Sequence, residues 1–71
     1  MKDLSRLRAL RKEKKLSQTE MGELLKVSMR QYQRYEYGEQ ELSIDGWIFL
    51  ADFYNVSLDY LVGRSDRRER Q

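Results

Sequence analysis

The sequence predicts a small all-α protein of five helices. Its 71 residues include no proline, and its four glycines are scattered along the chain, a composition that does not favour a β fold with many turns. Serines repeatedly precede stretches in which apolar residues recur every three or four positions, as at the start of amphipathic helices. A chain of this length is expected to form one domain that buries only about 60% of its surface, which helical packing can achieve.

The first helix is predicted from Lys2 to Lys15. Leu4, Leu7 and Leu10 recur at the spacing of one inward-facing stripe, and basic side chains fill most of the remaining positions. The favoured interpretation is an amphipathic helix whose basic face is solvated and which packs beneath the next two helices. Contact of one or two of these basic side chains with phosphate groups is the alternative.

Two short helices joined by a tight turn are predicted for residues 18–37. Ser17 precedes the first of them, and Glu20 follows three residues later in the pattern of a capping box. Ser28 and Gln31 repeat the pattern at the second. The corner between them is then so short that it is typical either of an antiparallel helical hairpin or of a helix-turn-helix. The apolar spacing favours the helix-turn-helix, in which the two helices cross at a steep angle.

The helix-turn-helix register divides these side chains into an inner and an outer set. The inner apolar set is Met21, Leu25, Val27, Tyr32 and Tyr35. Gly22 supplies a small residue where the second helix passes close to the first. The outward-facing set on the second helix is Met29, Arg30, Gln33 and Arg34. Because Arg30 and Arg34 are four residues apart, their side chains lie one turn apart on this outer face.

Two further helices complete the predicted fold. After the polar segment 39–42, Ser43 is expected to cap a helix that Asn55 closes in a left-handed conformation. The core side of that helix is predicted as Ile44, Trp47, Ile48, Leu50, Ala51 and Tyr54. Ser57 caps the last helix and Gly63 ends it. The inward residues of the last helix are Leu58, Leu61 and Val62.

The domain is predicted to span residues 1–63, followed by a charged tail. Residues 64–71 include no apolar side chain and are expected to be disordered or to fray from the last helix. The sequence contains no transmembrane segment and no signal peptide, so a cytoplasmic protein is predicted.

The absence of cysteine and histidine excludes several kinds of chemistry. Without them the chain has no disulfide, no thiolate nucleophile, no imidazole base and no plausible set of zinc ligands. Its carboxylates stand singly at helix starts or on solvent-facing positions, where a solvated role is favoured over acid–base catalysis. We therefore expect no enzyme activity, no metal site and no cofactor.

The net charge of +2 conceals an uneven distribution along the chain. Residues 1–15 carry a net charge of +5, residues 16–63 of −5 and residues 64–71 of +2. Arg30 and Arg34 are two of the three basic residues in the acidic middle segment. Their shared outer face suits contact with nucleic acid, although the modest overall charge suggests that affinity depends on a dimer or on the basic first helix.

The stretch LSQTEMGELLKVSMRQYQRYEYGE resembles the helix-turn-helix of the phage-repressor family, the Cro or xenobiotic-response-element type of bacterial and phage regulator. The resemblance extends from Leu7 to Gly63 and includes LADFYNVSLDYLVG near its end. It implies the compact five-helix fold of the lambda-repressor-like DNA-binding domain. One position departs from the family, because Lys26 stands where a glycine usually accepts a positive φ angle. A left-handed lysine costs roughly 1 kcal/mol, so a slightly reshaped corner is expected.

The resemblance implies sequence-specific binding of double-stranded DNA by a transcriptional regulator, favoured as a repressor, with the helix Met29–Glu36 in the major groove. The implied base contacts are Met29, Arg30, Gln33 and Arg34. Arginine suits the O6 and N7 acceptors of guanine, Met29 a thymine methyl and Gln33 adenine, each against the alternative of simple exposure. The implied backbone contacts are Gln18 and Ser28, which also flank or cap helices. Arg11 and Glu36 are implied to form an internal ion pair.

A homodimer on a palindromic operator is expected, because two half-sites about one helical turn apart give more specificity than one. Phe49 and Phe53 project away from the predicted core side of their helix, and Tyr60 lies outside the inward stripe of the last helix. These three rings are the candidate dimer contact. The alternative is that neighbouring helices of the same chain cover them.

A second class of function stays open beside DNA binding. Small helical domains also serve as protein-interaction modules, for example as antitoxins or as partners that sequester a regulator. An RNA-binding domain is less favoured, because Tyr32 and Tyr35 face inward where single-strand readers need exposed aromatic rings. If the chain binds DNA, its expected location within the cytoplasm is the nucleoid.

Overall fold

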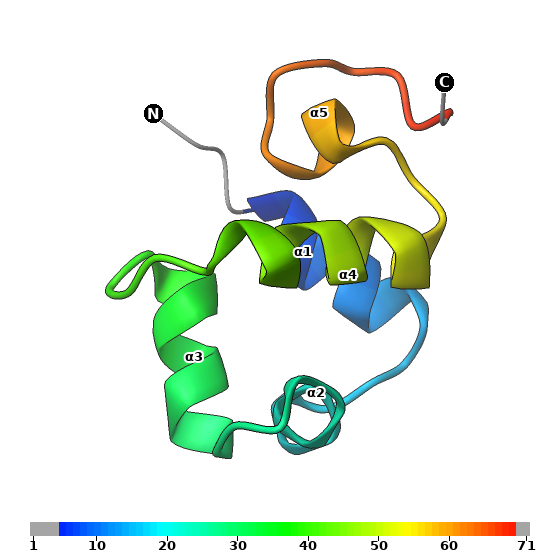
Figure 1. The fold of residues 1–71 in the computed structure, drawn as a ribbon. Coiled ribbons are helices and arrows are strands. Elements are labelled where there is room, and N and C mark those ends of the chain that lie inside the picture. Colours follow the sequence, from blue (N-terminus) through cyan, green and yellow to red (C-terminus); the bar gives the residue numbers. More distant parts are fainter. Residues whose placement is uncertain (1–4, 70–71) are drawn as a thin grey trace.

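The computed structural model describes residues 5–69, and its regular elements in this range are all α-helices (Figure 1). They are α1 (Ser5–Glu13), α2 (Gln18–Leu25), α3 (Met29–Tyr37), α4 (Ile44–Tyr54) and α5 (Leu58–Leu61). The predicted all-α class with five helices is confirmed. Among the helices described, none is long and apolar enough to cross a membrane. The predictions for Leu4, for the helix start at Lys2 and for tail residues 70 and 71 lie outside the described residues.

A serine precedes each helix from α2 to α5 and accepts a hydrogen bond from the backbone N–H three residues later. The four caps are Ser17, Ser28, Ser43 and Ser57. The predicted capping box is complete at α2, where the Glu20 carboxylate also accepts from the Ser17 N–H at 2.9 Å. At α3 the predicted capping box is incomplete, because the side chain of Gln31 donates to the Tyr35 hydroxyl and makes no bond to the backbone of Ser28. Each serine fixes the start of its helix because it satisfies one N–H group that the helix leaves unpaired.

The corner between α2 and α3 has the backbone geometry that the family usually obtains with glycine. Lys26 ends α2 in a left-handed conformation with φ 61° and ψ 40°, so the lysine adopts the positive φ angle itself. Gly22 is buried, and a Cβ atom on it would lie 2.9 Å from the backbone oxygen of Val27. The corner residue Val27 and the cap residue Ser28 of α3 therefore approach α2 so closely that only glycine fits there without a shift of the backbone.

The hydrophobic core lies between the helices. Its buried members are Leu7, Leu10, Met21, Tyr32, Leu42, Trp47, Leu50, Ala51, Tyr54, Val56 and Leu61. Leu25, Val27 and Tyr35 are partly buried against them, so the predicted inner side of the motif is confirmed. Leu42 and Val56 are core residues that helical spacing does not predict, because both lie in loops next to α4.

The predicted core side of α4 is wrong at two positions. Ile44 and Ile48 are 65% and 45% exposed, whereas the other four predicted residues are buried. At 100° per residue the six predicted positions cover about 160° of the helix circumference. The segments that pack against α4 cover a narrower sector than this. Ile44 and Ile48 lie at one edge of the predicted sector and remain in solvent.

Residues 64–69, for which the sequence predicts a charged tail that is disordered or frays from the last helix, run back along the domain and contact α1. A guanidinium nitrogen of Arg6 on α1 lies 2.6 Å from the carboxylate of Asp66. A second contact joins Arg68 to Glu13, also on α1, at 3.0 Å. Charge pairs and hydrogen bonds thus hold a segment without apolar side chains, and these partners are distant in sequence.

Both described ends of the chain lie on the side of the domain away from the helix-turn-helix corner (Figure 1). The beginning of α1 and the tail are near α5, while α2 and the first turn of α3 occupy the opposite side. Contacts between α1 and α5 and between α2 and α3 agree with this division. The motif is therefore carried at one end of the molecule.

We predict that Lys26→Gly stabilises the domain by up to about 1 kcal/mol, because glycine relieves the steric cost of the left-handed conformation while adding some freedom to the unfolded chain. Urea denaturation measures the free energy of unfolding. Asn55→Gly is the matched control, since Asn55 has φ 56° and ψ 49°. Asparagine tolerates this region, so a smaller gain is expected there. Unchanged or lower stability of the Lys26 variant contradicts the prediction.

Candidate nucleic-acid interface

The outer face of α3 gathers the four side chains predicted to contact bases. Met29, Arg30 and Arg34 are exposed, and Gln33 is half-buried. Their positions share one face of an α-helix, and α3 packs its opposite face into the core. The structure therefore brings these four residues together on one surface of a nine-residue helix.

The guanidinium groups of Arg30 and Arg34 do not contact an acidic side chain of the described residues. Within residues 5–69 neither forms an ion pair, whereas Arg6, Arg11 and Arg68 do. Arginine presents a planar fork of N–H donors that matches the paired O6 and N7 acceptors of guanine. Because the major groove of B-DNA admits an α-helix, α3 can carry both forks to base edges.

Ser28 stands at the beginning of this face and caps α3. Its hydroxyl oxygen accepts a hydrogen bond from the Gln31 N–H at 3.0 Å, and the residue is exposed. A hydroxyl that accepts in a cap still carries a hydrogen that it can donate. Helix N-termini also favour anions. Capping and phosphate contact are therefore compatible roles for Ser28, of which the second stays a prediction.

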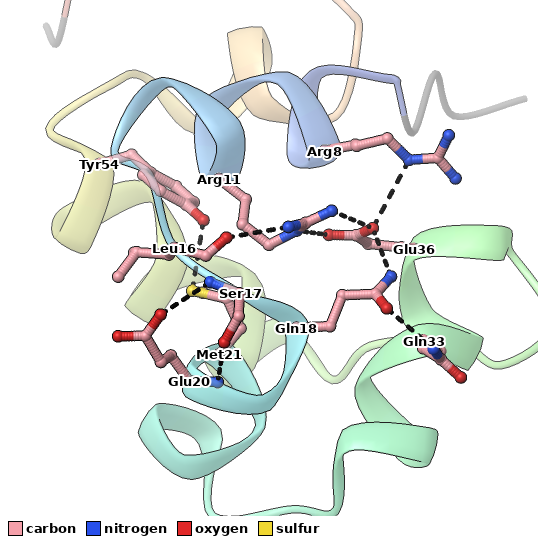
Figure 2. Close-up of polar contacts among 10 residues, drawn as sticks. All are labelled: Arg8, Arg11, Leu16, Ser17, Gln18, Glu20, Met21, Gln33, Glu36 and Tyr54. Atoms are coloured by element: carbon pink, nitrogen blue, oxygen red, sulfur yellow. Dashed lines mark hydrogen bonds and ion pairs between the residues drawn. The ribbon is translucent and has the colours of Figure 1, made fainter.

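Beneath the outer face, Arg11 of α1 and Glu36 of α3 are in direct contact in the protein interior (Figure 2). Nε of Arg11 lies 2.6 Å from Oε2 of Glu36, and their side chains are 10% and 0% exposed. Arg11 also donates to the carbonyl of Leu16 at 2.9 Å. A second arginine of α1, Arg8, lies 3.6 Å from Oε1 of Glu36. These contacts tie α1 to α3.

Gln18 connects this buried pair to the outer face of α3 (Figure 2). Its amide nitrogen donates to Oε1 of Glu36 at 3.2 Å. Its amide oxygen accepts from the amide nitrogen of Gln33 at 2.8 Å. Gln18 is half-buried at the first position of α2. The bond to Glu36 uses one of its two amide hydrogens, so the predicted phosphate contact would use the other.

The surroundings of Glu36 keep its carboxyl ionised although it is buried. Burial disfavours the charged form, but hydrogen bonds, of which that from Arg11 is the strongest, outweigh it and lower the pKa of Glu36. The same hydrogen bond raises the pKa of Arg11. Burial and the Glu36 carboxylate raise the pKa of Tyr32, so its hydroxyl stays protonated. Glu36 is a lone anion, and residues 5–69 contain no cluster of acidic side chains that could hold a metal ion.

Arg8 and Gln18 have contacts that the sequence does not predict. Arg8 approaches Glu36 from a position three residues before Arg11. This spacing is a sequence signal for a shared role, because residues i and i+3 lie on the same face of a helix. No comparable signal exists for the bond between Gln18 and Gln33, which depends on how α2 and α3 cross.

Two of the three predicted dimer residues are partly covered by the chain itself. Phe49 is 40% exposed, and its ring stacks on Phe53 with centroids 6.2 Å apart and an interplanar angle of 11°. Phe53 is half-buried against the core. Arg6 and Arg68 lie over the ring of Tyr60, with guanidinium carbons 4.1 and 5.6 Å from its centroid. The exposed part of the predicted patch is therefore centred on Phe49.

Five short helices, a tight corner between α2 and α3, and an exposed polar face on α3 define a helix-turn-helix domain. Residues 7–61 match the helix-turn-helix family model, which covers most of the chain. The chain belongs to the helix-turn-helix family of transcriptional regulators, of the phage-repressor type.

Several curated relatives share this domain. The chain is 36% identical over 61 residues to YobD, an uncharacterized HTH-type transcriptional regulator of Bacillus subtilis, and the alignment covers 86% of this chain and 54% of YobD. It is 32% identical over 71 residues to RstR, the cryptic phage CTXphi transcriptional repressor of Vibrio cholerae, covering 100% of this chain and 63% of RstR. The chain thus spans only about half to two thirds of these relatives. No solved structure matches it significantly.

We predict that Arg11→Met and Glu36→Gln each destabilise the domain by about 3 to 5 kcal/mol, because each removes one partner of a buried ion pair. The double variant should lose less than the sum of the two losses. Urea unfolding of the four proteins measures this coupling.

The exposed pair of Arg68 and Glu13 is the matched control for that cycle. Its atoms are 3.0 Å apart, but its side chains are 47% and 60% exposed. Little coupling is expected there, because water screens exposed charges. If the losses at Arg11 and Glu36 are simply additive, their contact does not stabilise the fold as a pair.

Proposed function

We propose that the chain is a sequence-specific, double-stranded DNA-binding regulator of transcription that places α3 in the major groove. The observation that carries the proposal is the exposed pair of Arg30 and Arg34, which no carboxylate within residues 5–69 neutralises. Four residues of helix separate them by about 6 Å along the axis. Two guanidinium groups on one face of α3 at this separation can each reach a guanine of its own in the groove.

The remaining predicted contacts fit around these two arginines. Ser28 and Gln18 begin α3 and α2, where the positive ends of the helix dipoles favour phosphate groups. Phosphate contacts of this kind fix the register of a protein on the duplex without reading sequence. Met29 and Gln33 complete the reading surface, with Met29 against a thymine methyl and Gln33 against adenine.

Repression is the favoured outcome of binding. RstR is named as a transcriptional repressor, and YobD and a third relative, AnsR of Bacillus subtilis, are named as transcriptional regulators. AnsR is 33% identical over 67 residues, in an alignment that covers 94% of this chain and 58% of AnsR. A protein-interaction module such as an antitoxin is less favoured, because it leaves the exposed arginines of α3 without a role. The cytoplasm, at the nucleoid, is the proposed location.

The regulator is proposed to bind a palindromic operator as a homodimer through the exposed side of α4. The ring of Phe49 is exposed and is backed by Phe53, while Tyr60 lies at the rim beneath its two arginines. A two-fold axis close to Phe49 would set each ring against its mate in an isologous contact. Such a contact would hold the two α3 helices at the spacing of two half-sites, about one helical turn apart.

We predict that Arg30→Ala and Arg34→Ala each weaken binding to the operator by about 1 to 3 kcal/mol and leave the fold intact. Binding to random duplex should fall much less, since it depends on phosphate contacts. Titrations against both duplexes across a salt series measure the two effects. Arg67→Ala, at a tail position with a 75% exposed side chain, is the control and should not change selectivity. Equal losses on both duplexes would assign the two arginines to phosphates.

We predict that Phe49→Glu produces monomers that keep their helical content but lose cooperative binding to a palindromic site, because the contact would bury an unpaired charge. Sedimentation and circular dichroism test this. Ile44→Glu is the matched control, since Ile44 is 65% exposed on the same helix. It lies about 140° around the helix from Phe49, so dimers should persist. Wild-type protein that sediments as a monomer at tens of micromolar, with and without operator, rules out the dimer.

A further inference from the structure

The Glu36 carboxylate determines which way the side chain of Gln18 points. A glutamine amide has a donor end and an acceptor end of nearly equal size, so its hydrogen-bond partners decide its orientation. An ionised carboxylate only accepts, and the lowered pKa of Glu36 keeps it ionised. Gln18 must therefore turn its nitrogen toward Oε1 of Glu36, 3.2 Å away. Arg11 holds the other carboxylate oxygen at 2.6 Å and so fixes the anion in place.

The orientation then passes from Gln18 to Gln33 (Figure 2). With its nitrogen toward Glu36, Gln18 directs its oxygen at α3, where it accepts from Nε2 of Gln33 at 2.8 Å. If the Gln33 amide were turned over, two carbonyl oxygens would face each other and the half-buried hydrogen bond would be lost. Gln33 therefore keeps its nitrogen toward Gln18 and its oxygen on the side away from it.

This orientation distinguishes the two purines in the major groove. Gln33 offers its oxygen as an acceptor, and the second hydrogen of its nitrogen remains as a donor. Adenine presents the N6 donor beside the N7 acceptor, whereas guanine presents the acceptors O6 and N7. We propose that Gln18 and Glu36 are positioning residues that hold the Gln33 amide in the orientation that reads adenine and rejects guanine. The inference rests on the proposed function, because it requires α3 in the major groove.

The hydrogen bond to Gln18 also lowers the conformational entropy that the Gln33 side chain loses when DNA binds. Gln33 is tied to α2 before any ligand arrives, so little freedom of its side chain remains to be lost. Arg30 and Arg34 are exposed and make no such bond within residues 5–69, so each of them must be ordered when it binds. Selectivity at the base pair of Gln33 therefore depends on residues that need not touch that base pair.

The test measures base preference in addition to affinity. Selection of the full chain on randomised duplexes identifies an operator, and each of its base pairs is then replaced in turn. Dissociation constants of wild type are measured by fluorescence anisotropy. Gln33→Ala identifies the base pair that Gln33 faces as the one at which discrimination is lost. Wild type should discriminate against guanine there on the order of tenfold or more.

Gln18→Met removes the bridge and leaves the Arg11–Glu36 contact in place. Discrimination at the base pair of Gln33 should fall to about threefold or less, while discrimination at the base pairs of Arg30 and Arg34 stays unchanged. Loss of a phosphate contact from Gln18 would weaken binding to all sequences alike and leave these ratios unchanged. Selectivity at one base pair is thus a readout that a purely phosphate-binding or structural role does not affect.

A rescue variant completes the experiment. Gln33→Glu in the Gln18→Met background carries a carboxylate, which only accepts and needs no orientation, so preference for adenine over guanine should return at lower affinity. Wild-type discrimination in the Gln18→Met protein, or a loss that is uniform over all sequences, overturns the inference while the proposed function stands. Failure of wild type to prefer any duplex in the selection overturns the proposed function itself.

Discussion

The contact between Arg11 and Glu36 is the interaction on which the arrangement of this domain depends. The two residues are 25 positions apart in the sequence, so the contact forms only when α1 packs against α3. The side chain of Glu36 is fully buried, and a buried carboxylate without its cation is costly on the scale of the stability of so small a domain. The placement of α3 is therefore set by an electrostatic requirement as well as by the packing of apolar side chains.

Sequence signals predicted the helices well because the causes of these helices are local. The serine caps of α2 to α5 and the left-handed end of α4 at Asn55 each act within a few residues. The errors in the predicted core arise where burial depends on segments that are distant in the sequence. Ile44 and Ile48 have core spacing, but no other segment of the described chain covers them fully. The contacts of residues 64–69 with α1 join residues that are far apart in the sequence, so no local signal indicates them.

The distinction between local causes and contacts of distant segments also separates the predictable from the unpredictable part of the site. Helical periodicity was sufficient to place the outward set on α3, and a family resemblance implied the ion pair beneath it. The bond between Gln18 and Gln33 followed from neither, because it depends on how α2 and α3 cross, and Gly22 leaves room there for the corner between them. The outer face of α3 thus has two kinds of position. Gln33 is hydrogen-bonded to Gln18 and through it to the interior, whereas Arg30 and Arg34 can be substituted without loss of such a bond.

The position of the two described ends, at residues 5 and 69, has a practical consequence. The beginning of α1 and the described part of the tail lie on the side of the domain opposite the corner between α2 and α3 (Figure 1). On the proposed mode of binding, a reporter, a nuclease or a methyltransferase joined by genetic fusion at either end would project away from the duplex. The fold thus has the layout of an exchangeable targeting unit, in which the reader and the point of attachment can be engineered separately.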